Sequence, residues 1–70
     1  MFDYSKLRGR IREIFGTQST FAKLLGISEA TLSKKLNNET DFTQSEMNRS
    51  CDLLKFPCSE IPVYFFTAKV

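Results

Sequence analysis

The apolar residues of this chain recur at helical rather than strand spacing. Over residues 4–15 they fall three or four positions apart, which places four of them on one face of a helix: Tyr4, Leu7, Ile11 and Ile14. Asp3 is a suitable N-cap for this first helix, and Gly16 ends it. Alternation of the kind that marks a strand is absent, and only the last segment, residues 63–70, leaves room for it.

Two shorter amphipathic segments follow, over residues 18–25 and 29–36. Thr17 and Ser28 precede them as N-caps, and Gly26 ends the first of the two. Their apolar positions, together with the turn residue between them, are Phe21, Ala22, Leu24, Leu25, Ile27, Leu32 and Leu36. The polar run that follows has turn chemistry, and either Asn37 or Asn38 is suited to a left-handed backbone conformation.

The clearest helix start in the sequence is TQSE at residues 43–46, which has the form of a capping box. Phe42 before the cap and Met47 inside the helix have the spacing of a hydrophobic staple. This fourth helix must end before Pro57, because the residue that precedes a proline disfavours helical geometry.

The end of the chain is its most apolar part. A short fifth helix or turn begins near Ser59, with Pro62 tolerated only in the first turn. We expect the tail, residues 61–70, to fold back over the first and fourth helices; the alternative is a seam between two copies of the chain. The sequence as a whole predicts an all-α fold, a compact five-helix domain that spans residues 1–70.

Composition limits the chemistry of the chain. With 70 residues it makes one domain at most, and 41% hydrophobic residues suffice for a core without a metal or a disulfide. There is no His, so only Cys51 and Cys58 could supply strong zinc ligands, and a structural zinc site needs four. We therefore expect no metal, and two free, buried thiols in a reducing cytoplasm.

Several classes of protein are not expected from this sequence. The segment after Phe2 is polar and basic rather than a secretory signal, and the longest apolar run, residues 61–66, is far below the roughly 18 residues of a membrane span. Without His, a nucleophile paired with a base, or a phosphate-cradling glycine loop, an enzyme is not expected, nor a cofactor or small-molecule substrate. The expectation is a soluble, cytoplasmic, non-catalytic protein.

Charge is distributed unevenly along the chain. The formal net charge is +2, but residues 1–35 carry seven basic and three acidic side chains, whereas residues 36–70 carry three basic and five acidic ones. The first half therefore suits a polyanion, with an affinity that should be modest and sensitive to salt. The basic side chains of the first helix have the alternative interpretation of a solvated helix face.

Residues 18–37 have the spacing of two helices that meet at a tight corner. Ala22 is small where the helices would cross, Gly26 frees the backbone to turn, and Leu25 and Leu32 can meet across the corner. A purely structural corner is the alternative. The N-caps, the turn glycine and the polar, basic third helix together predict a helix-turn-helix.

The pattern QxxFAxxLGISxxTLS, residues 18–33, resembles the helix-turn-helix of the Cro/C1 (Xre-type) regulators of phages and bacteria. The resemblance extends over the whole chain, because such domains contain five helices in about this length. The segments MFDYSKLRGRI, TLSKKLNN and IPVYFF are more narrowly similar to small temperate-phage switch proteins of Gram-positive hosts, of the Cro-like or modulator-of-repression kind.

The resemblance implies that the third helix lies in the major groove of DNA with its first residues on base edges. Carried over position by position, it implies four base-facing residues: Glu29, Ala30, Ser33 and Lys34. Lys34 would donate to guanine, Ala30 would contact a thymine methyl, and Glu29, which can only accept, would favour cytosine. The pairs 29/33 and 30/34 are four residues apart and share one helical face.

The resemblance also implies contacts to the phosphate backbone. Thr17 and Gln18, at the start of the second helix, match the phosphate clamp of the family. Five further candidates would reach phosphate from the far side: Asn37, Asn38, Thr40 and the amides of Thr43 and Gln44. Lys35 departs from the family pattern, in which this position is often apolar, and we interpret it as a backbone contact. Ordinary solvent-facing polar residues are the alternative for Ser33, Asn37 and Thr40.

Two functional hypotheses of different classes follow. In the first, the protein is a phage-type transcriptional regulator of a lysis/lysogeny switch that binds double-stranded operator DNA in the host bacterial cytoplasm, as a homodimer if the tail forms a seam. In the second, it is an antirepressor or modulator that docks on the phage repressor protein through the same face and alters that repressor's DNA binding. The intact motif favours the first hypothesis, whereas the small net charge and Glu29 favour the second.

Overall fold

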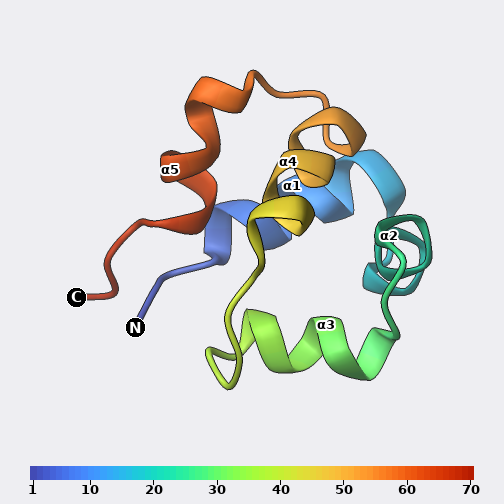
Figure 1. The fold of residues 1–70 in the computed structure, drawn as a ribbon, viewed down its shortest axis with the longest axis horizontal. Coiled ribbons are helices and arrows are strands. Elements are labelled where there is room, and N and C mark those ends of the chain that lie inside the picture. The colour runs from blue at the N-terminus through green and yellow to red at the C-terminus, as the bar shows by residue number, and fades with distance from the viewer.

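The helices of the structure follow the predicted ones along the chain (Figure 1). The computed structural model describes residues 1–70, and its regular elements are α1 (Ser5–Phe15), α2 (Gln18–Leu25), α3 (Glu29–Leu36), α4 (Gln44–Leu53), the 3-10 turn η1 (Cys58–Glu60) and α5 (Ile61–Phe65). The prediction of an all-α fold with five helices is confirmed. None of these helices combines the length and the apolar character that a membrane crossing requires.

Side-chain caps set the start of the three middle helices. Thr17 Oγ1 and Ser28 Oγ each accept a hydrogen bond from the amide three residues ahead, at 3.3 and 3.0 Å. The capping box of α4 is complete, because the Glu46 amide donates to Thr43 Oγ1 (3.1 Å) and the Thr43 amide donates to the Glu46 carboxylate (2.9 Å). These local signals explain why α2, α3 and α4 begin where the sequence predicts.

The first helix begins one residue later than predicted, at Ser5. Asp3 still supports the helix start, because its carboxylate accepts hydrogen bonds from both the hydroxyl and the amide of Ser5. These two bonds lower the pKa of Asp3 below its ordinary value, since they stabilise the charged form. Of the two asparagines suited to a left-handed backbone, Asn38 adopts it, with φ 63°.

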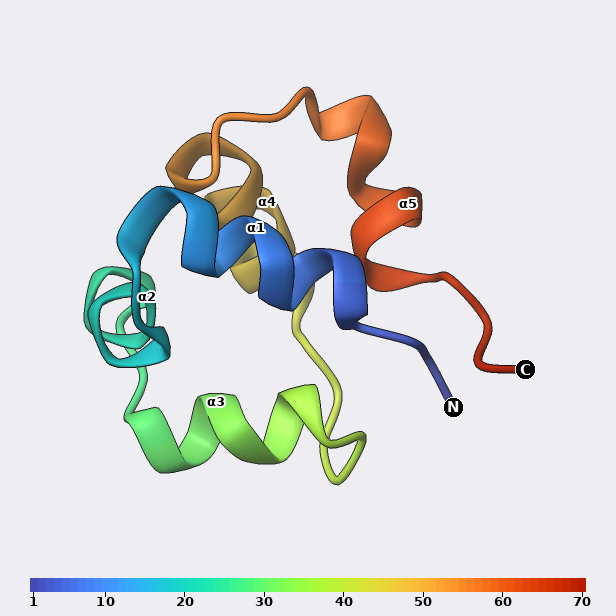
Figure 2. The same ribbon diagram turned by 180° about the vertical axis from the view of Figure 1, so that it is seen from behind.

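The core lies where α1, α2, α4 and α5 meet, and α3 closes one edge of the molecule (Figures 1 and 2). α3 contributes Leu32 and Leu36 to this core. α5 contacts both α1 and α4 and buries Tyr64 and Phe65, so the predicted packing of the tail over these helices is confirmed for residues 61–65. Phe66, which follows α5, remains 49% exposed.

The two ends of the chain are fastened to each other and to the loop after α3. The Asp3 amide donates to the Thr67 carbonyl (2.8 Å), and the Lys69 amide donates to the Met1 carbonyl (3.2 Å). The Asn38 side chain completes the junction: it accepts from the Phe2 amide (2.8 Å) and donates to the Phe2 carbonyl (2.9 Å). The end of α3 is therefore anchored to the chain termini, which lie close together in Figure 1.

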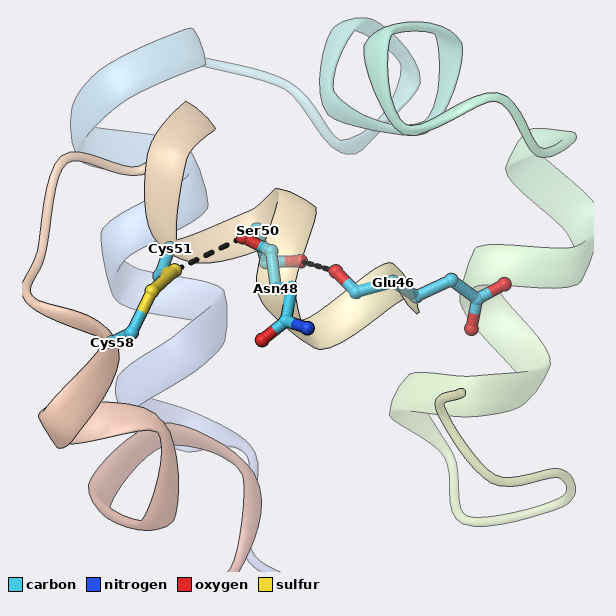
Figure 3. The surroundings of a disulfide bond; sticks show 5 residues. All are labelled: Glu46, Asn48, Ser50, Cys51 and Cys58. Atoms are coloured by element: carbon cyan, nitrogen blue, oxygen red, sulfur yellow. Dashed lines mark hydrogen bonds between the residues drawn. A yellow bond between two sulfur atoms is a disulfide. The ribbon is translucent and has the colours of Figure 1, made fainter. Parts of the chain in front are cut away.

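Cys51 and Cys58 are joined by a disulfide (Figure 3), so the expectation of free thiols was wrong. Cys51 is buried on α4, whereas Cys58 is exposed at the start of η1. The chain reverses between them and brings their Cα atoms to 5.5 Å, within the range of roughly 4.4–6.8 Å that a disulfide requires. A spacing of seven residues does not by itself specify this approach.

Reduction of the Cys51–Cys58 disulfide should lower the free energy of unfolding by about 2 kcal/mol, because the bond closes a short loop and restricts the unfolded chain. Urea unfolding with and without dithiothreitol measures this difference. Cys58→Ser is the control: its side chain is exposed, so the variant should match the reduced protein and ignore dithiothreitol. Two titratable thiols in the untreated protein would contradict the disulfide.

Candidate functional site

The corner between α2 and α3 has the predicted construction. Gly26 adopts a left-handed conformation with φ 87°, and both its amide and that of Ile27 donate to the Ala22 carbonyl at 3.0 Å. Leu25 and Leu32, on either side of the turn, are both buried. A residue with a Cβ atom would adopt this conformation at Gly26 only under strain, so the glycine fixes the angle at which α3 leaves α2.

The four predicted base-facing residues lie together on the outer face of α3, defined here by Glu29, Ala30, Ser33 and Lys34. Glu29, Ala30 and Lys34 are exposed, and Ser33 is half-buried. Neither Glu29 nor Lys34 takes part in an ion pair within the molecule. α3 runs along the edge of the fold (Figure 1), so this face is open to a partner.

Lys35 points inward rather than toward solvent. Its Nζ lies 3.0 Å from a Glu46 carboxylate oxygen, donates to the Asp41 carbonyl (2.8 Å) and sits 5.8 Å from the centre of the Phe42 ring. The Lys35 side chain is only 9% exposed and that of Glu46 15%. The prediction that Lys35 contacts the phosphate backbone is therefore wrong: its amine is occupied in holding α3 against the start of α4.

Two other predicted phosphate contacts are also occupied within the molecule. Both polar atoms of the Asn38 side chain bond the backbone of Phe2. The Thr43 amide is bonded within the capping box. The Asn37 side-chain oxygen accepts from Arg8 (3.0 Å), but the Asn37 NH2 group, which would donate to a phosphate, makes no hydrogen bond within the molecule, so this contact stays a prediction. The Asn38 side chain and the Thr43 amide would each have to exchange an internal hydrogen bond for a phosphate, which removes most of the gain.

The remaining candidates are placed where the sequence predicts. Thr40 and Gln44 are exposed in and just after the loop that follows α3. Gln18 is half-buried at the first position of α2, and Thr17 is exposed with its hydroxyl oxygen occupied as the cap. Contacts from these four residues to phosphate stay predictions.

Three arginines have a role that sequence reasoning missed, because each binds the C-terminal end of a distant helix. Arg8 Nη2 lies 3.2 Å from the last carbonyl oxygen of α3, and Arg49 Nε lies 2.9 Å from the carbonyl oxygen of Leu24 in the last turn of α2. Arg10 Nε lies 2.8 Å from the carbonyl oxygen of Leu54, the C-cap of α4. A guanidinium at this position satisfies a free carbonyl and the negative end of the helix dipole.

These contacts change the electrostatic picture of the α2–α3 corner. Of the seven basic side chains in residues 1–35, four are engaged in internal contacts: Lys6 lies 5.3 Å from the centre of the Tyr64 ring, and Arg8, Arg10 and Lys35 form hydrogen bonds. On the outer face of α3 the single cation Lys34 is offset by Glu29. The outer face of α3 is thus polar and close to neutral, while the exposed Lys23 in the last turn of α2 adds one cation to the corner.

The site is thus a polar, nearly neutral helix that lies exposed beside a tight corner of a compact all-helical fold. Residues 1–68 match the model of the family described as "Protein of unknown function (DUF739)", and the chain belongs to this family. No curated protein matches the chain.

The fold is also that of a solved phage protein. The chain superposes with a TM-score of 0.81 on the solution structure of the modulator of repression (MOR) of the temperate bacteriophage TP901-1 from Lactococcus lactis. The two sequences are 43% identical. The match covers 99% of this chain and 93% of that one. The predicted relation to phage switch proteins is thereby confirmed, whereas membership of the Cro/C1 family stays a prediction.

Lys35→Ala should lower the free energy of unfolding by about 3 kcal/mol, because it leaves the Glu46 carboxylate largely buried without its cation. Lys34→Ala is the matched control: it removes the neighbouring exposed lysine and should change stability by less than about 0.5 kcal/mol. Chemical denaturation of the two variants measures the difference. Equal stability would show that the buried ion pair does not hold α3.

Asn38→Gly should lower the free energy of unfolding by about 1–2 kcal/mol, because it removes two hydrogen bonds to Phe2 while glycine keeps the left-handed backbone. Lys55→Gly tests the backbone effect alone, since Lys55 has φ 58° and an exposed side chain. Lys55→Gly should leave the free energy of unfolding unchanged. A loss of the same size in both variants would assign the effect to glycine rather than to the junction with the N-terminus.

Proposed function

We propose that the protein modulates a phage lysis/lysogeny switch by binding the phage repressor through the outer face of α3 and altering that repressor's DNA binding. The observation that carries this proposal is the charge balance of the face, where Glu29 in the first turn of α3 offsets Lys34. The 43% identity to the TP901-1 modulator of repression supports it.

The distribution of cations makes this face a weak ligand for DNA. Non-specific DNA affinity comes from Lys and Arg side chains that neutralise phosphates. Arg8 and Lys35, which flank the end of α3, are engaged in internal bonds, and Lys34 is the one free cation on the outer face. Glu29 lies at the start of α3, the end that would contact base edges. There the DNA phosphates would repel its carboxylate unless the carboxylate accepted a hydrogen bond from a cytosine.

The same arrangement suits a basic protein surface. The DNA-binding surface of a repressor carries cations that neutralise phosphates, and these cations are partners for the exposed Glu29 carboxylate. Ala30 and Ser33 are small and lie between the two charges, so a partner helix can approach closely. Occupation of this surface on the repressor would exclude operator DNA from it.

Direct binding to operator DNA is the second candidate. It is supported by the α2–α3 corner, whose glycine turn and caps agree with the helix-turn-helix that the sequence resembles, and by the exposed Lys34. In this role Lys34 and Ala30 would contact base edges. The two candidates use the same face, so one set of variants separates them.

The experiment is an anisotropy titration of labelled operator DNA with the protein alone, with the repressor of the same phage alone, and with both. We expect no sequence-specific binding by the protein alone and a lower operator affinity of the repressor in its presence. Glu29→Lys should weaken the protein–repressor complex by at least about tenfold, because it places like charges opposite one another.

Glu39→Lys is the control for Glu29→Lys. It makes the same charge change at an exposed residue outside α3 and should leave the complex within about threefold of the wild type. Operator binding by the protein alone that is lost in Lys34→Ala would favour the second candidate. An equal effect of the two reversals would remove the outer face of α3 from the proposal.

A further inference from the structure

A second surface lies away from the outer face of α3, on the side where α4 and α5 meet. Here a cavity of about 250 Å³ opens to solvent, and we call it the α4–α5 groove. Its walls are almost entirely apolar, with one carboxylate at the mouth: Phe2, Phe42, Met47, Phe65, Phe66 and Asp41. A second hollow adjoins it, shares Met47 and Phe66, and extends the apolar surface to Ile61.

The groove is already formed in the free protein. The Phe42 and Phe65 rings, both buried, contact edge to face with their centres 5.0 Å apart and make a rigid floor. One rim is Phe66, which packs edge to face on Phe2 at 5.7 Å and yet remains 49% exposed. An exposed aromatic held in a fixed position beside a hollow is typical of a binding surface, because little ordering is left to complete on association.

The size of the cavity favours a side chain over a small molecule. Ligand pockets for drug-sized molecules have volumes of roughly 300–1,000 Å³ and several convergent polar groups. This cavity, at about 250 Å³, is smaller and has a single charged group, Asp41. Two adjoining hollows that share Met47 and Phe66 suit two apolar side chains one helical turn apart.

The charge of the rim specifies the chemistry of the partner. No basic residue lines either hollow. The exposed Asp41 carboxylate has no ion pair, and neither has the exposed Glu39 nearby in the same loop. Burial raises the pKa of Tyr4 in the groove, and the charge of Asp41 raises it further, so the negative potential of Asp41 reaches the groove wall.

We propose that the α4–α5 groove is a docking site for an amphipathic helix of a partner protein, with two apolar side chains held by Met47 and Phe66 and a Lys or Arg paired with Asp41. A second copy of this chain fits less well. A two-fold contact through the groove would bring the acidic loops of both copies, with Glu39 and Asp41, toward each other. The site stands independently of the function proposed for α3.

The test uses two synthetic helical peptides with the same Leu residues at helical spacing, one carrying Arg beside them and the other Glu at that position. Each is titrated into the isotope-labelled full chain, and binding is followed by amide chemical shifts. We expect the Arg peptide to bind at least about tenfold more tightly than the Glu peptide, with shifts confined to residues around the groove. Equal affinities, or shifts centred on α3, would overturn the proposal.

Three variants locate the contacts. Phe66→Ala should weaken binding of the Arg peptide about tenfold, whereas Val63→Ala, which truncates another exposed apolar residue outside both hollows, should have no effect. Asp41→Asn should abolish the preference for Arg, and it preserves the main-chain carbonyl that Lys35 requires. If Phe66→Ala does not fold, Asp41→Asn and Val63→Ala decide the outcome. Sedimentation of the free protein as a dimer that Asp41→Asn tightens would assign the groove to self-association instead.

Discussion

The ion pair between Lys35 and Glu46 is the contact on which the position of α3 depends. α3 gives the apolar core only two leucines, and polar contacts supply the rest of its attachment to the fold. The lysine amine binds a carboxylate on α4 and the Asp41 carbonyl in the intervening loop, and so joins three consecutive pieces of chain. Because the same Glu46 completes the capping box, one side chain both starts α4 and orients the outer face of α3.

The features that could be predicted from the sequence are those decided by neighbours in the chain. Thr17, Ser28 and the TQSE run fix helix starts within three residues of themselves, and Gly26 fixes the corner, so α2, α3 and their exposed face followed directly. Lys35 shows where this reasoning fails. A lysine beside Lys34 on an amphipathic helix suggests a solvated residue, and only the path of the loop to Glu46 places it inside. The disulfide and the arginine caps join residues that only the folded path of the chain brings together. Arg10 and the carbonyl that it caps, for example, are 44 positions apart in the sequence.

Formal charge is accordingly a poor guide to what this protein binds. The excess of cations in residues 1–35 suggests a polyanion, but a large part of it neutralises helix ends and a buried carboxylate inside the molecule. Charge is distributed differently over the exposed surface than along the sequence. α3 presents one charge of each sign, and the groove beside α5 is apolar with an acidic mouth. Neither surface gathers the several free cations that phosphate binding requires, and this is why we propose protein partners for both.

The hydrogen bonds between the two chain ends determine where a tag fused to the protein would lie. Chain termini are ordinarily free, and tags are added to them for that reason. Here the backbones of Met1 and Lys69 are hydrogen-bonded to each other, and Phe2 is hydrogen-bonded to Asn38 in the loop after α3. Anything fused to either chain end therefore emerges beside the C-terminal end of α3. A bulky fusion at either end would therefore crowd the C-terminal end of α3, whereas a small fluorescent dye at the same place would report on contacts made there.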